Sequence, residues 1–156
     1  QNLTEAPELP STDLATSCYL YMFQGCTSLQ TAPALPATQL AISCYQNMFQ
    51  GCTSLQTAPD LPAPALAKDC YYMMFFGCSQ LNSIKCLATT NINSNGSTDY
   101  WVHGVASSGT FTKASGASWP TNSSSGIPTG WTEVDYSDPS NPNGNGFHFG
   151  TDNGQW

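Results

Sequence analysis

The chain has 156 residues, a length usual for one domain, and only 8 % of them are charged, against roughly 25 % in ordinary globular proteins. Three lysines, no arginine and ten acidic residues give a formal net charge of -7, which excludes a phosphate-binding basic surface. We therefore expect no nucleic acid partner, and, since no apolar run approaches the roughly 20 residues that span a bilayer, no membrane insertion.

An internal repeat with a period of 26 residues fills the first half of the chain. Residues 18–43 and 44–69 differ at only seven of their 26 positions. A third copy begins at Cys70 and diverges after Leu81, and residues 3–17 match the back half of the unit. A period of 26 lies within the 20 to 29 residues that are typical of leucine-rich repeats.

Each copy is expected to hold a short helix and then a short strand. The motif C-Y-x-x-M-F-x-G-C spaces its apolar residues as one face of a helix, which Gly25, Gly51 or Gly77 would end. The proline-bearing segment L-x-x-A-P-x-L-P that follows is typical of an extended edge strand. We therefore predict a leucine-rich-repeat solenoid over residues 1–87, with one short helix or turn and one short strand in each 26-residue coil.

Stacked coils would place equivalent residues of successive copies above one another, about 4.8 Å apart. Uncharged side chains suit this arrangement, because like charges directly opposite each other would repel. The predicted core ladder consists of the small or apolar residues that recur at the period of the repeat: Cys18, Cys44, Cys70, Cys26, Cys52, Cys78, Phe23, Phe49, Phe75, Leu29, Leu55 and Leu81.

The repeat resembles the BspA-like leucine-rich repeats of bacterial surface proteins. Its consensus sequence, CYxxMFxGCTSL…APxLPA, is similar to a variant found in gut Bacteroidales. The corresponding residues of the first copy are Cys18, Met22-Phe23, Cys26 and Leu29, then Ala32-Pro33 and Leu35-Pro36. This resemblance covers roughly residues 1–90. It implies an extracellular or cell-surface protein that adheres to other molecules.

Seven cysteines, with Cys86 outside the repeat pattern, leave two interpretations open. Disulfides within a coil, such as Cys18–Cys26, require a helix of only a turn or two, because eight residues of intact helix would separate the Cα atoms by about 12 Å. The interpretation that we favour is a ladder of small buried hydrophobic residues. The spacings lack the close pairs of a zinc site, so we expect no metal.

After Leu87 the composition changes, and residues 88–134 are predicted to form a β-rich C-terminal cap. Segments 100–105, 109–114 and 130–136 are rich in aromatic and β-branched residues and are separated by Gly, Ser or Pro, as strands are. Residues 135–156 form an acidic tail rich in Asn and Gly. Part of it has the outline of a calcium loop but lacks the acidic ligands, so a turn-rich loop is favoured.

Aromatic residues provide the candidates for binding. Tyr19, Tyr45 and Tyr71 recur at the repeat period and form either a binding platform or a half-buried ladder over the core. The tryptophans of the cap serve either as its core or as a sugar-binding surface. The candidates in the tail are Phe147, Phe149 and Trp156.

Catalytic candidates are few. His103 and His148 are the only histidines, and the chain has no nucleophile elbow, paired-carboxylate motif or phosphate-binding glycine loop. We expect no enzymatic activity and no cofactor. The predicted function is an extracellular or cell-surface recognition and adhesion module that binds a host or bacterial surface protein or a glycan through a ladder of repeated side chains. The alternative is a structural subunit of a filament, pilus or phage virion, in which copies of the chain assemble through the solenoid ends and the tail.

Overall fold

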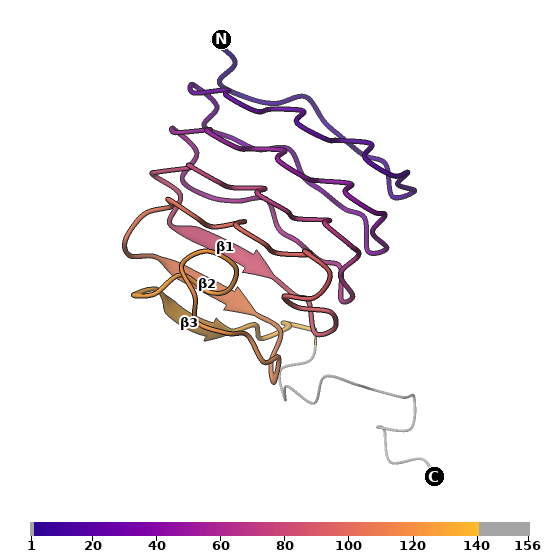
Figure 1. Cartoon of the computed structure of the whole chain (residues 1–156), viewed down its shortest axis with the longest axis vertical. Coiled ribbons are helices and arrows are strands. Elements are labelled where there is room, and N and C mark those ends of the chain that lie inside the picture. The colour runs from indigo at the N-terminus through magenta and orange to yellow at the C-terminus, as the bar shows by residue number, and fades with distance from the viewer. Residues whose placement is uncertain (1, 141–156) are drawn as a thin grey trace.

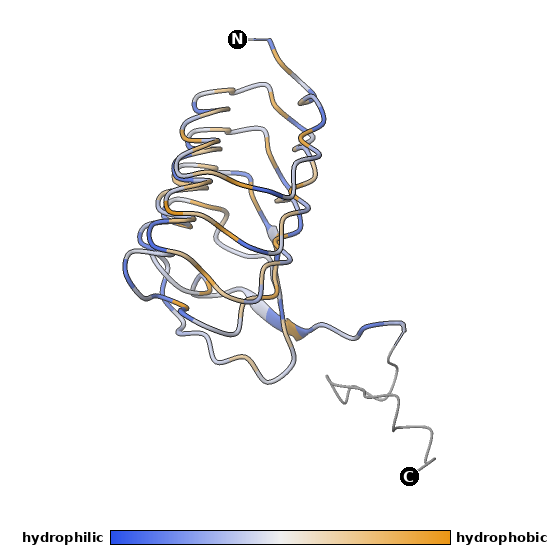
Figure 2. Ribbon diagram, turned by 90° about the vertical axis from the view of Figure 1, so that its right-hand side faces the viewer, coloured by the Kyte–Doolittle hydropathy of each residue, from blue (hydrophilic) through white to orange (hydrophobic). Residues whose placement is uncertain are grey.

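The computed structural model describes residues 2–140, which wind in successive coils stacked along one axis (Figure 1). Turned by 90°, the coils again lie one above another, and hydrophobic segments recur from coil to coil (Figure 2). The calcium-loop outline and the candidates Phe147, Phe149 and Trp156 lie outside the described residues.

One side of each coil is a ribbon of overlapping turns. Every second N–H group bonds to the carbonyl three residues back, as Met22 N does to Tyr19 O at 3.2 Å. The N–H groups between them bond to the next coil, as Phe23 N does to Met48 O at 2.9 Å. An α-helix directs its interior N–H groups four residues back along its own chain and leaves none for a neighbour. The ribbon therefore joins the coils through the backbone itself.

Left-handed residues prevent the ribbon from becoming a helix. In the first copy φ is 56° at Ser17, 57° at Tyr21 and 72° at Gly25, a spacing of four residues that the second and third copies repeat. A positive φ interrupts the right-handed helical path. The apolar residues at i, i+4 and i+8 follow this period of four, which is close enough to 3.6 to imitate a helix in the sequence.

The predicted leucine-rich-repeat solenoid, with a helix or turn and a strand in each coil, is therefore wrong. The described residues contain no helix, and their strands number three: β1 (Ser83–Cys86), β2 (Thr110–Lys113) and β3 (Thr132–Asp135). They form one open parallel sheet in the order β1-β2-β3, at one end of the stack (Figure 1).

Proline explains why the strands begin only at the third copy. The sequence T-A-P occurs at residues 31–33 and again at 57–59, but the third copy has Ser83, Ile84 and Lys85 in these places. Proline has no N–H to donate to a neighbouring strand and disfavours a paired position inside a sheet. With Lys85 in place of proline, β1 pairs with β2 in the register Ser83↔Thr110 to Cys86↔Lys113.

The core is built from columns of equivalent side chains. The rings of Phe23 and Phe49 stack with centroids 5.6 Å apart, and those of Phe49 and Phe75 stack at 5.8 Å. The predicted ladder residues lie in this core except for Cys18, which is exposed because the first coil has no described coil above it.

The hydrogen-bond ladder continues beyond Leu87. Tyr71 N bonds to Ser97 O at 2.9 Å, and the rings of Tyr71 and Trp101 stack at 5.8 Å. Residues 100–105, predicted as a strand, instead form a fourth ribbon of turns with positive φ at Tyr100 and Gly104. Segments 109–114 and 130–136 contain β2 and β3, as predicted. The ladder thus crosses the boundary expected between residues 87 and 88.

The segment 119–128 closes the stack below the fourth ribbon. The indole of Trp101 donates to Gly126 O at 3.0 Å, and Val102 N donates to Ser124 O at 3.2 Å. The ring of Trp119 stacks on Trp101 with centroids 5.5 Å apart. At this end, side-chain bonds and a single backbone bond from Val102 replace the regular row of backbone bonds.

Candidate binding surface

The tyrosine column predicted as a binding platform lies inside the protein. Tyr45 is 2 % exposed and Tyr71 is 0 % exposed, while Tyr19 at the open end is half-buried. The three rings stack at 5.9 and 6.1 Å as part of the core. A partner cannot reach the inner two rings, so the column stabilises the coils and does not form the predicted contact surface.

Six of the seven cysteines are buried in the core, and Cys18 is exposed. Cys18, Cys44, Cys52, Cys70, Cys78 and Cys86 are free thiols and Cys26 is buried, so the intracoil disulfides are not formed. The Cys52 thiol donates to Phe23 O at 3.1 Å, and burial raises its pKa to about 12. Among residues 2–140, no group of three or more histidines, cysteines or acids could hold a metal ion.

Aromatic side chains do gather outside the core, on the ribbons of the third and fourth coils. Tyr72 and Tyr100 meet edge to face with centroids 6.4 Å apart, and Phe76 and His103 stack at 5.0 Å. Tyr100 is 50 % exposed, His103 is exposed, and Tyr72 and Phe76 are half-buried. We call these four residues the aromatic patch.

The ribbon places both ring pairs on its outer side. Its buried residues recur every fourth position, so residues four apart, such as Tyr72 and Phe76, share one side. Hydrogen bonds hold the lower ribbon of the patch from below: Tyr100 N donates to Ser125 Oγ at 3.4 Å, and Nδ1 of His103 lies 3.3 Å from Ser124 Oγ. The patch is therefore carried by an ordered backbone.

The third copy differs from the first two at the positions of Tyr72 and Phe76, and this difference is the sequence signal of the aromatic patch. The residues equivalent to Tyr72 are Leu20 and Gln46, and those equivalent to Phe76 are Gln24 and Gln50. In the upper coils, Gln24 Nε2 donates to Gln50 Oε1 at 3.1 Å in the place that a ring pair takes below. Departures of the third copy from the first two mark the patch.

His103, a catalytic candidate of the sequence, lies in the aromatic patch. Its ring faces Phe76 on one side and contacts the Ser124 hydroxyl with Nδ1. A nucleophile–base pair requires a third group to orient the base, and the ring makes no other hydrogen bond to the described residues.

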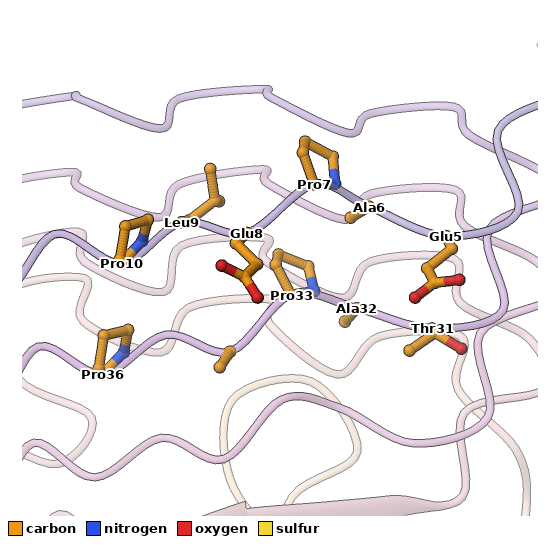
Figure 3. Close-up of a pocket in the computed structure, with 11 residues that line it drawn as sticks. Glu5, Ala6, Pro7, Glu8, Leu9, Pro10, Thr31, Ala32, Pro33 and Pro36 are labelled. Carbon is orange, nitrogen blue, oxygen red and sulfur yellow. The ribbon is translucent and has the colours of Figure 1, made fainter.

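Hollows also lie between the coils away from the patch, two of them lined as follows. A polar one of about 460 Å³ is lined by uncharged amides and hydroxyls, among them Gln30, Ser54 and Gln56. The other, of about 320 Å³, lies at the first two coils, where Pro7 stands over Pro33 and the carboxylates of Glu5 and Glu8 are exposed (Figure 3). Neither hollow brings together an acid, a base and a nucleophile.

Comparison with protein-family models, with curated proteins and with solved structures gives no match to this chain. Residues 2–140 contain no helix that is long and apolar enough to cross a membrane. The surface of the protein therefore provides the evidence for its function.

Proposed function

We propose that the chain is a non-catalytic recognition module that binds a glycan through the aromatic patch, at the cell surface or outside the cell. The observation that carries the proposal is the pair of exposed ring contacts, Tyr72–Tyr100 and Phe76–His103, on a fixed backbone. Aromatic faces stack on the C–H faces of pyranose rings, and tyrosine does so at a small cost in side-chain entropy. The phenol, imidazole and serine groups of the patch offer hydrogen bonds to sugar hydroxyls.

Charge favours a neutral glycan over other ligands that stack on aromatic rings. Single-stranded nucleic acids use similar rings but also need a positively charged groove, and the chain has only three lysines. A stable protein–protein interface covers about 800 Å² on each partner, more than four partly buried rings provide. A polyhydroxylated neutral ligand requires neither charge nor so large an area.

The repeat supplies a test that leaves the fold intact. Tyr72→Gln together with Phe76→Gln places in the third copy the residues that the second copy already carries at Gln46 and Gln50. After a screen for neutral oligosaccharide ligands, calorimetry should show a loss of affinity of about 5- to 150-fold, since two ring contacts of about 0.5–1.5 kcal/mol each are removed. The matched control, Gln24→Ala with Gln50→Ala, changes the same outer side of the upper coils and should bind as the parent does.

Two outcomes would contradict the proposal. One is unchanged glycan affinity in the folded Tyr72→Gln, Phe76→Gln variant, which would place the site elsewhere. The other is shortening of the bound oligosaccharide during incubation, detected by chromatography, which would make the protein an enzyme.

The alternative of a structural subunit receives less support. Copies that stack end to end would need a row of open N–H donors below the fourth ribbon. The segment 119–128 already covers that end, with Thr98 Oγ1 bound to Ser125 O at 2.8 Å and Trp101 bound to Gly126 O.

A further inference from the structure

The first coil exposes residues that the second coil buries. Met22 is 43 % exposed, whereas its equivalent Met48 is 0 % exposed. Cys18 is likewise exposed and its equivalent Cys44 is buried. The motif is the same in both coils, so the difference arises from what covers them.

The backbone groups left open at this end of the stack are all of one kind, carbonyl acceptors. In the second ribbon, the carbonyls of Cys44, Gln46, Met48 and Gln50 each accept an N–H from the first ribbon. The equivalent carbonyls of the first ribbon, at Cys18, Leu20, Met22 and Gln24, accept no backbone bond from the described residues. The N–H groups of the first ribbon are all directed along the ribbon or toward the second coil. The outer surface of the first ribbon is therefore a row of acceptors beside exposed apolar side chains.

From this polarity we propose that the outer surface of the first coil is a docking face for one further coil of the same repeat. Such a coil carries N–H groups at every second residue and places its Tyr and Met over Tyr19 and Met22, while Phe23 is already buried. The interface would be a continuation of the one that the chain already forms between its first and second coils.

The same polarity argues against other occupants. A second copy that docked face to face would set carbonyls against carbonyls, which leaves both rows without donors. A second copy that docked with its opposite end would present a surface that the segment 119–128 already covers, with Val102 N bound to Ser124 O and Tyr100 N bound to Ser125 Oγ.

The experiment extends the chain by a half-coil. Because residues 3–17 match the back half of the unit, the nine residues CYQNMFQGC of positions 44–52, placed directly before Gln1, continue the repeat in register. The control extension carries Asn47→Pro and Phe49→Pro in the added copy, which removes two donor N–H groups without changing the length.

The reactivity of Cys18 reports docking. With the repeat extension, alkylation of Cys18 should slow at least tenfold relative to the original chain, and the amides of the extension should become protected from hydrogen exchange. With the proline control, Cys18 should be alkylated as fast as in the original chain. The amides of that extension should exchange as fast as those of an unstructured peptide. Equal Cys18 reactivity in the two extended chains would overturn the proposal. So would concentration-dependent dimerisation of the original chain that protects Cys18, since the face would then belong to a second copy.

Discussion

The phenylalanine column allows a quantitative test of how the coils hold together. Phe49 is fully buried between two rings, at 5.6 Å from Phe23 and 5.8 Å from Phe75, whereas Phe23 has a ring neighbour on one side only. Truncation of a buried phenylalanine to alanine costs about 3–5 kcal/mol, and each stacked ring pair contributes about 0.5–1.5 kcal/mol beyond its buried area. Phe49→Ala should therefore lower the free energy of unfolding by about 1 kcal/mol more than Phe23→Ala does.

Urea unfolding, followed by circular dichroism and by tryptophan emission, measures both variants. Phe49→Leu serves as the control, since it keeps most of the volume and should cost less than Phe49→Ala. An equal or smaller loss in Phe49→Ala than in Phe23→Ala would refute the idea that the column acts as a continuous stack.

Three further predictions concern the buried thiols and tyrosines. At pH 8, iodoacetamide should alkylate Cys18 first, because Cys52 is buried and its pKa is raised to about 12; peptide mass spectrometry would show the order. Since burial also raises the pKa of Cys44 to about 11, the stability that these neutral thiols contribute is complete below about pH 9 and is lost as the pH rises through 11 to 12. A urea midpoint that stays constant from pH 7 to 11 would contradict this. Tyr71→Phe should leave the free energy of unfolding unchanged or raise it by up to about 1 kcal/mol in the same urea assay, because the buried hydroxyl has no hydrogen-bond partner within residues 2–140.

The repeat period could be predicted from the sequence, but the conformation within it could not. Identity at 26-residue spacing places Phe23, Phe49 and Phe75 in one column whatever the backbone does between them. The helix was expected because apolar residues recur at i, i+4 and i+8. That spacing also fits a ribbon whose N–H groups alternate between its own turns and the next coil, a pattern that depends on the neighbouring coil and leaves no local signature. Left-handed φ at Ser17 and Tyr21, residues that rarely take it, shows that stacking overrides local preference.

A related reason explains why Tyr45 and Tyr71 lie in the core although their recurrence suggested a binding platform. A residue that recurs at every coil, such as the tyrosine at positions 19, 45 and 71, is one that every coil needs for stacking, and it is therefore buried. Function is better sought where a copy departs from the others while the backbone stays the same. The change from glutamine to Phe76 brings a ring onto His103.

The change from proline to Lys85 shows that such departures also alter the fold. It supplies an N–H where the upper coils have none, and β1 forms there. The ammonium of Lys85 then lies 4.1 Å from the centroid of the Tyr136 ring and 3.7 Å from a carboxylate oxygen of Asp60. Lys85 thus lies in the first strand of the sheet, where the upper coils make isolated bridges such as Glu5↔Thr31, and supplies a cation for the residue that follows β3. In a repeat of nearly identical copies, the positions that differ carry the information about where the stack ends and which surface it presents.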